Sequence, residues 1–231
     1  MSGRRKPWQG LAGQLLSSLG RWLPRRFFFA SELVLNYLAV GHWMRRRGFA
    51  PVAQKRDRVD HFRAVAAGMA DQPVAYLEFG VREGESLRLW AELLAHSESE
   101  LHGFDSFEGL PEDWGLHQPK GAFDQGGRAP VFEDPRVVLH QGWFEQTLPE
   151  FKVPTDKRLV VHCDADLYSS TKIVLDSLGK HFRAGTILMF DEFPVREHEL
   201  KAFDEYLLAH PAELRILSAT RGFAQVAFEF L

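Results

Sequence analysis

The spacing of apolar residues changes character near Pro73, which divides the chain into two parts. Before Pro73, apolar residues recur at helical spacing, which predicts helices over 28–47 and about 57–70, after a loose or only locally helical stretch over 1–26. From Pro73 onward, short apolar runs alternate with amphipathic segments, as in a mostly parallel sheet with helices on both faces. The expected strands cover 74–79, 100–104, 136–140, 158–163, 186–190, 214–218 and 224–230. The expected helices cover 84–96, 144–151, 169–182 and 197–208.

This alternation also predicts how the chain is divided into domains. We expect a basic N-terminal helical extension over 1–70, followed by one α/β domain over 71–231. The last two strands join through a tight turn at Arg221-Gly222, so they must run antiparallel. Residues 105–134 form a connection that is too long for a plain loop. The aromatic residues in this connection indicate that it forms a lid that covers a binding site. The alternative is a loop that only extends over the surface.

Composition and charge narrow the class of protein. The chain has 231 residues, of which 45% are hydrophobic, and this suits one compact domain with a substantial core. A net charge of −3 offers no overall attraction to nucleic acid, although residues 1–60 are strongly basic and the remainder is acidic. The single cysteine, Cys163, lies in an apolar run and excludes a disulfide framework or a Cys-rich zinc site. We therefore expect a cytoplasmic protein without a nucleic-acid partner.

The apolar segment from Phe27 to Met44 is flanked by arginines and needs an explanation of its own. A spanning helix is disfavoured, because Glu32 would cost about 3 kcal/mol in the membrane core. We expect this helix to pack on the body or on a partner subunit, with peripheral attachment of the basic arm to a membrane as the alternative. We also expect a homo-oligomer formed through the N-terminal helices, because several aromatic residues there need cover; they are Phe27, Phe28, Phe29 and Trp43.

A glycine turn follows the first expected strand of the α/β domain. Gly80 allows a sharp turn and a close approach of a ligand, while Gly84 and Ser86 open the next helix. Glu78, at the end of the strand, would repel a pyrophosphate but could hold the charged amino-acid end of a sulfonium cofactor. The spacing Gly-x-x-x-Gly differs from the Gly-x-Gly-x-x-Gly of nicotinamide enzymes. A tight strand-to-helix turn without a ligand remains the alternative.

Asp105 ends the next expected strand and adds the second half of a cofactor site. An acid at this position can accept hydrogen bonds from both hydroxyls of a ribose. Together, Glu78, Gly80 and Asp105 fit an adenosyl cofactor with an unphosphorylated ribose, which leaves S-adenosylmethionine and NAD as candidates.

Two carboxylate clusters follow two later strands. Asp164 and Asp166 come after the run 158–163, and Asp191 and Glu192 come after 186–190. Parallel strands end on the same rim of a sheet, so these four acids meet there and require a cation or protons. A divalent-metal site at this rim is the expected result. In the alternatives, Asp166 caps the following helix and the second cluster is a solvated strand end.

The acids that follow the second cluster have a simpler interpretation. We expect them to form a solvated face of the last long helix; they are Glu197, Glu199, Asp204 and Glu205.

Taken together, these motifs resemble those of the S-adenosylmethionine-dependent sugar O-methyltransferases of the macrocin O-methyltransferase type. The resemblance covers 76–193, and its order and spacing are specific. It rests on Leu77-Glu78-Phe79-Gly80-Val81, Gly103-Phe104-Asp105-Ser106-Phe107-Glu108-Gly109-Leu110-Pro111, Gly142-Trp143-Phe144, Asp164-Ala165-Asp166-Leu167-Tyr168 and Asp191-Glu192-Phe193. It implies a class I methyltransferase fold, a Rossmann-like and mostly parallel sheet of seven strands with helices on both faces.

The resemblance also implies roles for individual residues. Positions that match cofactor contacts in the family are Glu78, Gly80, Ser86, Asp105, Ser106 and Asp164, with Gln141 and Gly142 beside the adenine. Positions that match ligands of Mg²⁺ are Asp164, Asp191 and Glu192, and Asp166 matches the proposed general base. The chain departs from the family at Ala165, where glycine is usual, and at Glu192, where a shorter aspartate is more common.

Three functions are compatible with these observations. The first is Mg²⁺-dependent methyl transfer from S-adenosylmethionine to a hydroxyl of a small, sugar-bearing acceptor; the cation would lower the pKa of that hydroxyl. The second is an NAD-linked oxidoreductase on a similar sheet, which the glycine spacing and Glu78 disfavour. The third is a non-catalytic protein that retains the fold, which the departures at Ala165 and Glu192 permit.

Overall fold

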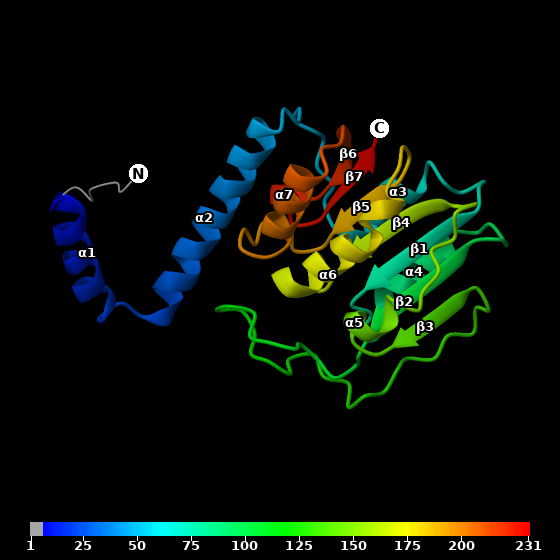
Figure 1. Cartoon of the computed structure of the whole chain (residues 1–231), viewed down its shortest axis with the longest axis horizontal. Helices are drawn as coiled ribbons and strands as arrows, with labels where there is room; N and C mark the ends of the chain where they lie inside the picture. The colour runs from blue at the N-terminus through cyan, green and yellow to red at the C-terminus, as the bar shows by residue number, and fades with distance from the viewer. Residues whose placement is uncertain (1–6) are drawn as a thin grey trace.

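The computed structural model describes residues 7–231 and centres on one sheet of seven strands (Figure 1). The strands are β1 (Val74–Phe79), β2 (Glu100–Asp105), β3 (Val137–Gln141), β4 (Arg158–Cys163), β5 (Ile187–Phe190), β6 (Leu214–Ala219) and β7 (Val226–Phe230). Their order in the sheet is β3-β2-β1-β4-β5-β7-β6, and β7 pairs antiparallel with both β5 and β6. The predicted class I methyltransferase sheet, closed by an antiparallel pair, is therefore confirmed.

The helices fall into an N-terminal group and a group that alternates with the strands. The first group is α1 (Pro7–Gly20), α2 (Arg25–Arg46) and α3 (Arg58–Ala66). The second group is α4 (Glu85–Leu93), α5 (Phe144–Thr147), α6 (Tyr168–Leu178) and α7 (Glu199–Ala209), with the short 3-10 turns η1 (Gly179–His181) and η2 (Arg221–Phe223). The helix α5 has one turn, shorter than predicted. Within the stretch 1–26, 7–20 is helical, whereas Arg4, Arg5 and Lys6 lie outside the described residues.

Helices cover both faces of the sheet because alternate residues of each central strand are apolar on both sides (Figure 1). In β1, Ala75, Leu77 and Phe79 join the core that packs against α2, α6 and α7. Val74 and Tyr76 join a second core against α3 and α4. This two-sided burial gives β1 the apolar run 74–77 and explains why a central strand could be predicted from sequence.

The C-terminal half of α2 is anchored to α7. The indole Nε1 of Trp43 donates to Asp204 Oδ1 at 2.6 Å, and Arg46 and Arg47 form ion pairs with the same carboxylate. The arginines hold the pKa of Asp204 below its usual value despite partial burial. The prediction that Asp204 belongs to a solvated helix face is therefore wrong, because this carboxylate fastens the extension to the α/β domain.

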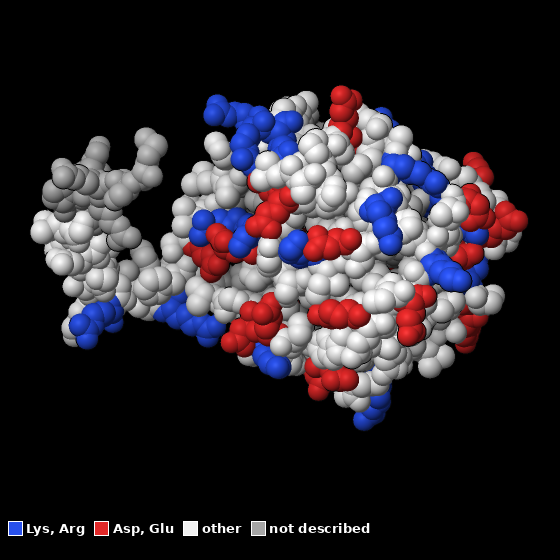
Figure 2. Space-filling model, in the orientation of Figure 1, with Lys and Arg blue, Asp and Glu red and all other residues white. Residues whose placement is uncertain are grey.

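The other end of the extension stands away from the body (Figures 1 and 2). Large apolar side chains are exposed along α1, in the turn after it and along α2 as far as Leu38; they are Leu11, Leu15, Leu16, Leu19, Trp22, Phe27, Phe28, Phe29, Leu33, Val34, Leu35, Tyr37 and Leu38. On the face of the body shown in Figure 2, basic and acidic side chains are interspersed. Among the helices of residues 7–231, none combines the length and apolar character that crossing a membrane requires. The predicted homo-oligomer stays a prediction.

The helix α3 is fixed to the sheet by its cap and by a buried histidine. Asp57 caps it by accepting a hydrogen bond from the backbone N–H of Asp60 at 2.9 Å. The ring of His61 is fully buried, and its Nδ1 lies 2.9 Å from Ser218 Oγ on β6. The start of α3 is thus held firmly beside the ends of β4 and β5.

His61 predicts a specific loss of stability in acid. Burial, aided by the nearby positive charge of His162, lowers its pKa to about 4. The neutral ring therefore stabilises the fold fully above the unfolded pKa of about 6.5, and this contribution is lost as the pH falls toward 4. Between pH 7 and pH 5, the free energy of unfolding should fall by roughly 2 kcal/mol more in the natural chain than in His61→Gln. Chemical denaturation measures this, with the exposed His42→Gln as control; equal pH dependence in all three proteins would contradict the expectation.

Candidate active site

A cavity of about 700 Å³ opens where β1, β2 and β4 end. Many of the residues predicted from sequence line it: Gly80, Ser86, Asp105, Ser106, Asp164, Asp166 and Glu192. Four predicted residues lie outside its lining: Glu78, Gln141, Gly142 and Asp191. At the expected adenine side the lining is instead formed by the start of α5, from Trp143 to Gln146. The fold therefore brings most residues of the predicted cofactor site and most of the predicted acid cluster into one cavity.

The glycine turn after β1 requires glycine for both conformation and space. Gly80 has φ +94°, and its backbone N–H donates to Phe104 O at 3.0 Å. A Cβ atom at this position would lie 1.9 Å from the backbone oxygen of Asp164. The turn therefore lies directly against the end of β4, and this brings the cofactor half and the acid half of the cavity together.

Asp105 holds the glycine turn in place. Its Oδ2 accepts hydrogen bonds from the backbone N–H groups of Val81 and Arg82, both at 2.8 Å, and its Oδ1 accepts from Phe107 N at 2.7 Å. The carboxylate borders the cavity, and Oδ1, which accepts a single hydrogen bond, has a further lone pair for a ribose hydroxyl, whereas Oδ2 already accepts two. The sequence did not indicate this backbone role; the ribose contact stays a prediction.

Glu78 lies behind the cavity wall and acts on it through Ser86. Its carboxylate is fully buried and accepts from Ser86 Oγ at 2.6 Å and from the Tyr76 hydroxyl at 2.7 Å. The same hydroxyl lies 2.7 Å from His162 Nδ1. Glu78 therefore orients Ser86, which does line the cavity, and its predicted direct contact with the cofactor remains untested.

His162 continues this buried network to the second acid cluster. Its Nε2 lies 3.5 Å from Asp191 Oδ1. Burial alone would lower the pKa of His162, but Asp191 and Glu78 outweigh burial and raise it to about 9. Burial likewise opposes ionisation of Asp191, yet His162 and Arg58 keep its pKa below the usual value. With an exposed fraction of only 7%, Asp191 is no solvated strand end, and that alternative is wrong.

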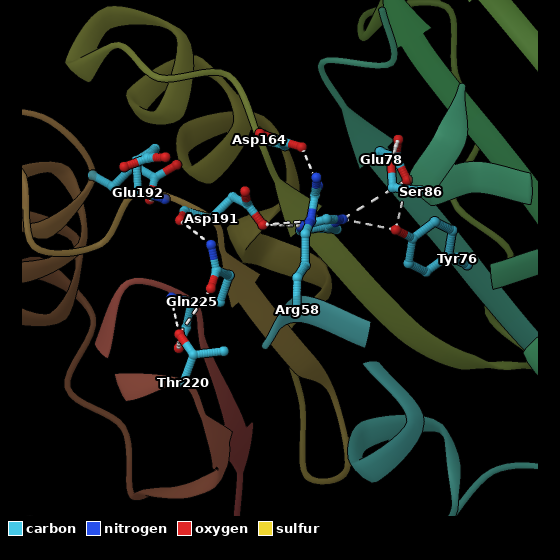
Figure 3. A network of polar contacts seen from close by, with 11 residues as sticks. Arg58, Tyr76, Glu78, Ser86, Asp164, Asp191, Glu192, Thr220 and Gln225 are labelled. Carbon is cyan, nitrogen blue, oxygen red and sulfur yellow. Dashed lines mark hydrogen bonds and ion pairs between the residues drawn. The ribbon is translucent and has the colours of Figure 1, made fainter. Parts of the chain in front are cut away.

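The first residue of α3 reaches into the acid cluster. The guanidinium of Arg58 pairs with Asp164 Oδ2, and its Nε lies 3.0 Å from Asp191 Oδ1 (Figure 3). Burial opposes the charge on Arg58, but the two carboxylates outweigh it and raise the pKa further. This contact could not be predicted from the sequence, because Arg58 lies in the extension and outside every motif.

Three acids of the chamber, Asp164, Asp166 and Glu192, ionise less readily than they would in water. Burial, reinforced by neighbouring carboxylates, raises the pKa of Asp164 above its usual value, that of Asp166 to about 8 and that of Glu192 to about 7. The possible ligands here are carboxylates, which repel one another when ionised. A hard divalent cation bound between them would offset this repulsion. This part of the cavity therefore has the chemistry of a cation site.

The residues with metal-ligand geometry differ from the predicted set. Asp164, Asp191 and His162 each place one ligand atom within 4.8 Å of the other two. Glu192 lies on the side of Asp191 away from Arg58 (Figure 3). The two aspartates fit a cation, but Arg58 now occupies the space between them.

Glu192 is held in place by a buried acid of α7. Its backbone N–H donates to Glu199 Oε2 at 2.9 Å, and Glu199 is fully buried. Burial, with the nearby Asp191 and Glu192, raises the pKa of Glu199 well above its usual value. The prediction that Glu199 belongs to a solvated helix face is therefore wrong.

Asp166 occupies a strained position with a free carboxyl group. Its φ is +60°, a conformation that residues other than glycine rarely adopt. The residue that caps α6 is Leu167, and Asp166 forms no side-chain hydrogen bond to any of residues 7–231, so the helix-cap alternative is wrong. Strain of this kind is concentrated at functional positions. Asp166 thus presents an unengaged carboxyl group to the cavity.

The long connection after β2 covers one side of the cavity. Leu110 and Trp114 pack with Leu167 and Val195 in a small separate core. Glu112 Oε1 accepts a hydrogen bond from Ser169 Oγ at 2.6 Å, which ties the connection to α6. Its predicted movement as a lid stays a prediction.

Comparison with known proteins identifies the family. Residues 77–193, half of the chain, match the sequence profile of a family described as Methyltransferase domain, and the chain belongs to this family. A curated relative from Streptomyces olivaceus is named 8-demethyl-8-(2,3-dimethoxy-alpha-L-rhamnosyl)-tetracenomycin-C 4'-O-methyltransferase. It is 30% identical over 147 residues, which cover 53% of this chain and 54% of the relative. The chain thus spans about half the length of this relative. The expected resemblance to sugar O-methyltransferases is confirmed.

Two solved structures share the fold. The crystal structure of CalS11, a calicheamicin methyltransferase, has a TM-score of 0.59 and 23% identity, and the match covers 98% of this chain and 94% of CalS11. The O-methyltransferase NovP has a TM-score of 0.54 and 19% identity, over 89% of this chain and 99% of NovP. At this identity the likeness concerns the fold.

Proposed function

We propose that this protein transfers a methyl group from S-adenosylmethionine to a hydroxyl of a small, sugar-bearing acceptor. The observation that carries the proposal is the position of the free Asp166 carboxyl group in the chamber bordered by the Gly80 turn and Asp105. In this arrangement the proposed cofactor contacts, Gly80 and Asp105, and the proposed proton acceptor, Asp166, line the same cavity. Membership of the methyltransferase-domain family supports this reading over an NAD-linked oxidoreductase.

The residues of the cavity fit the steps of such a transfer. S-adenosylmethionine, when bound, would supply an electrophilic methyl group. Asp166, in its ionised form, would take the hydroxyl proton while the acceptor oxygen forms its bond to the methyl carbon and the carbon–sulfur bond breaks. Gly80 and Asp105 would fix the donor so that oxygen, carbon and sulfur lie in line. The products are the methyl ether, S-adenosylhomocysteine and protonated Asp166.

The proposal includes a divalent cation, Mg²⁺ by its preference for oxygen ligands. Asp164, Asp191 and Glu192 would hold it, and it would lower the pKa of the acceptor hydroxyl. Support comes from the two aspartates at adjacent strand ends and from the crowding of acids around them. Because Glu192 lies apart from the other two, its side chain would have to turn toward them.

A sugar-like acceptor is supported by the lining and by the relative. Trp114, Phe123 and Trp143 border the cavity and offer aromatic faces, while Glu112 and Ser169 offer polar contacts to hydroxyl groups. The name of the curated relative places its methyl transfer on a rhamnosyl 4'-oxygen. We therefore propose a deoxysugar or a related polyhydroxylated ring as the acceptor class.

Titration of the purified chain with S-adenosylmethionine, S-adenosylhomocysteine and NAD tests the cofactor assignment. Both sulfur-containing ligands should bind with dissociation constants in the micromolar range, about 6–8 kcal/mol of binding free energy. NAD should show no saturable binding, because the Gly80 turn lacks the glycine spacing that accommodates a pyrophosphate. Isothermal calorimetry makes the measurement, and saturable binding of NAD alone would overturn the assignment.

A further inference from the structure

Arg58 occupies the place where the proposed function puts a divalent cation. One guanidinium contacts both Asp164 Oδ2 and Asp191 Oδ1, the carboxylate oxygens at the ends of β4 and β5 (Figure 3). We propose that Arg58 is a resident cation that competes with the divalent ion for this pair of aspartates. The inference rests on the proposed function, and it assigns the N-terminal extension a direct part in controlling the site.

The contacts of Arg58 explain how Asp164 and Asp191 can lie close together without a bound metal ion. Two carboxylates converge with the ring of His162 to within 4.8 Å, and the positive charge of that ring offsets only one of them, so the negative charge that remains would be costly without a further cation. The guanidinium supplies one positive charge and donors that can reach both acids. It also lies 5.1 Å from the Phe62 ring centroid on the same helix, which supports its flat face.

The surroundings of Arg58 allow its guanidinium to move away from the two aspartates. The backbone of α3 is fixed by the Asp57 cap and by His61, so the start of the helix does not have to move. The Arg58 side chain is 37% exposed and borders the cavity. Rotation of this side chain into the cavity would free both aspartates, and the 700 Å³ chamber has space for it.

Electrostatics makes the two occupants mutually exclusive. A divalent ion bound to Asp164 and Asp191 would lie within a few ångströms of the guanidinium in its present position, and like charges at that separation repel strongly in a partly buried site. Binding of the ion must therefore displace Arg58, and the cost of displacement weakens the measured affinity. In the metal-free protein, Arg58 keeps the two aspartates in position for the ion.

Binding of Mn²⁺ to the full-length chain tests the competition directly. Electron paramagnetic resonance counts free Mn²⁺ in titrations of the natural chain, Arg58→Gln, Arg58→Lys and the matched control Arg63→Gln. Arg63 lies on the same helix and is 63% exposed, and within residues 7–231 its side chain forms an ion pair with Asp60 alone, at 3.9 Å. We expect Arg58→Gln to bind Mn²⁺ about tenfold or more tightly than the natural chain. Arg58→Lys should bind with intermediate affinity, Arg63→Gln should match the natural chain, and adding Asp164→Asn to Arg58→Gln should abolish the gain.

Several results would overturn the inference. Equal affinity in the natural chain and Arg58→Gln, weaker binding in Arg58→Gln, or no binding in either protein would each contradict it. Circular dichroism checks folding; if Arg58→Gln does not fold, Arg58→Lys decides, and an affinity equal to that of the natural chain overturns the inference. Tight competition without methyl transfer would refute the proposed function and leave the competition intact, so the two failures can be distinguished.

Discussion

Replacing Asp166 with asparagine should lower the rate of methyl transfer by about 10²- to 10⁴-fold, the range that general-base catalysis contributes. The carboxyl group of Asp166 borders the cavity without a hydrogen bond to residues 7–231, so it is available to take a proton. Asparagine has nearly the same shape, tolerates the φ of +60° and cannot accept the proton. The change therefore removes the proposed chemistry and keeps the backbone.

The turnover number and the affinity for S-adenosylmethionine separate a catalytic from a structural effect in this variant. The turnover number should fall while calorimetric binding of the cofactor stays within about twofold of the natural chain. Asp156→Asn, at a carboxylate that is 77% exposed, serves as the matched control and should behave like the natural chain. Asp166→Asn with a normal turnover number would assign the proton to another acceptor.

Replacing Gly80 with alanine should both destabilise the fold and abolish cofactor binding. The new Cβ would lie 1.9 Å from Asp164 O, which is backbone and cannot turn aside. Left-handed strain and overpacking together should lower the free energy of unfolding by about 3–5 kcal/mol. Separation of β1 from β4 would also displace the turn held by Asp105, so affinity for S-adenosylmethionine should fall below detection.

Gly185→Ala is the matched control for this prediction. Gly185 has φ +85°, close to that of Gly80, but a Cβ there would meet nothing within 4 Å. The control therefore carries only the left-handed strain, about 1–2 kcal/mol, and should retain normal cofactor affinity. Urea denaturation and calorimetry make the comparison. If the two variants are equally stable and bind the cofactor equally well, the close contact between the Gly80 turn and β4 has no energetic role.

The elements of the α/β domain could be predicted because the signals are local. Central strands such as β1 and β5 are buried on both faces and appear as apolar runs, which only Glu78 interrupts in β1. The two acid clusters could be placed on one rim because parallel strands point the same way. The length of α5 was predicted as too great. The apolar residues that follow Thr147, Leu148 and Phe151, pack against the core from a loop and not from further helical turns.

The features that sequence could not predict depend on contacts between distant segments. Arg58 meets Asp164 across 106 positions, and no local pattern distinguishes it from the other arginines of the extension. Glu199 looks like a surface residue of an acidic helix, yet the fold buries it beneath Glu192. Both are polar groups whose environment is created only when the N-terminal and C-terminal helices dock on the sheet.

The most direct test of the proposed activity is a transfer assay with methyl-labelled S-adenosylmethionine, the full-length chain, Mg²⁺ and a panel of L-rhamnosides. The expected products are S-adenosylhomocysteine and an equal amount of a sugar carrying one new O-methyl group, identified by mass and by its NMR resonance. If the cofactor binds without transfer to any hydroxylated acceptor, or if the label is found on carbon or nitrogen, the protein is not an O-methyltransferase of this kind.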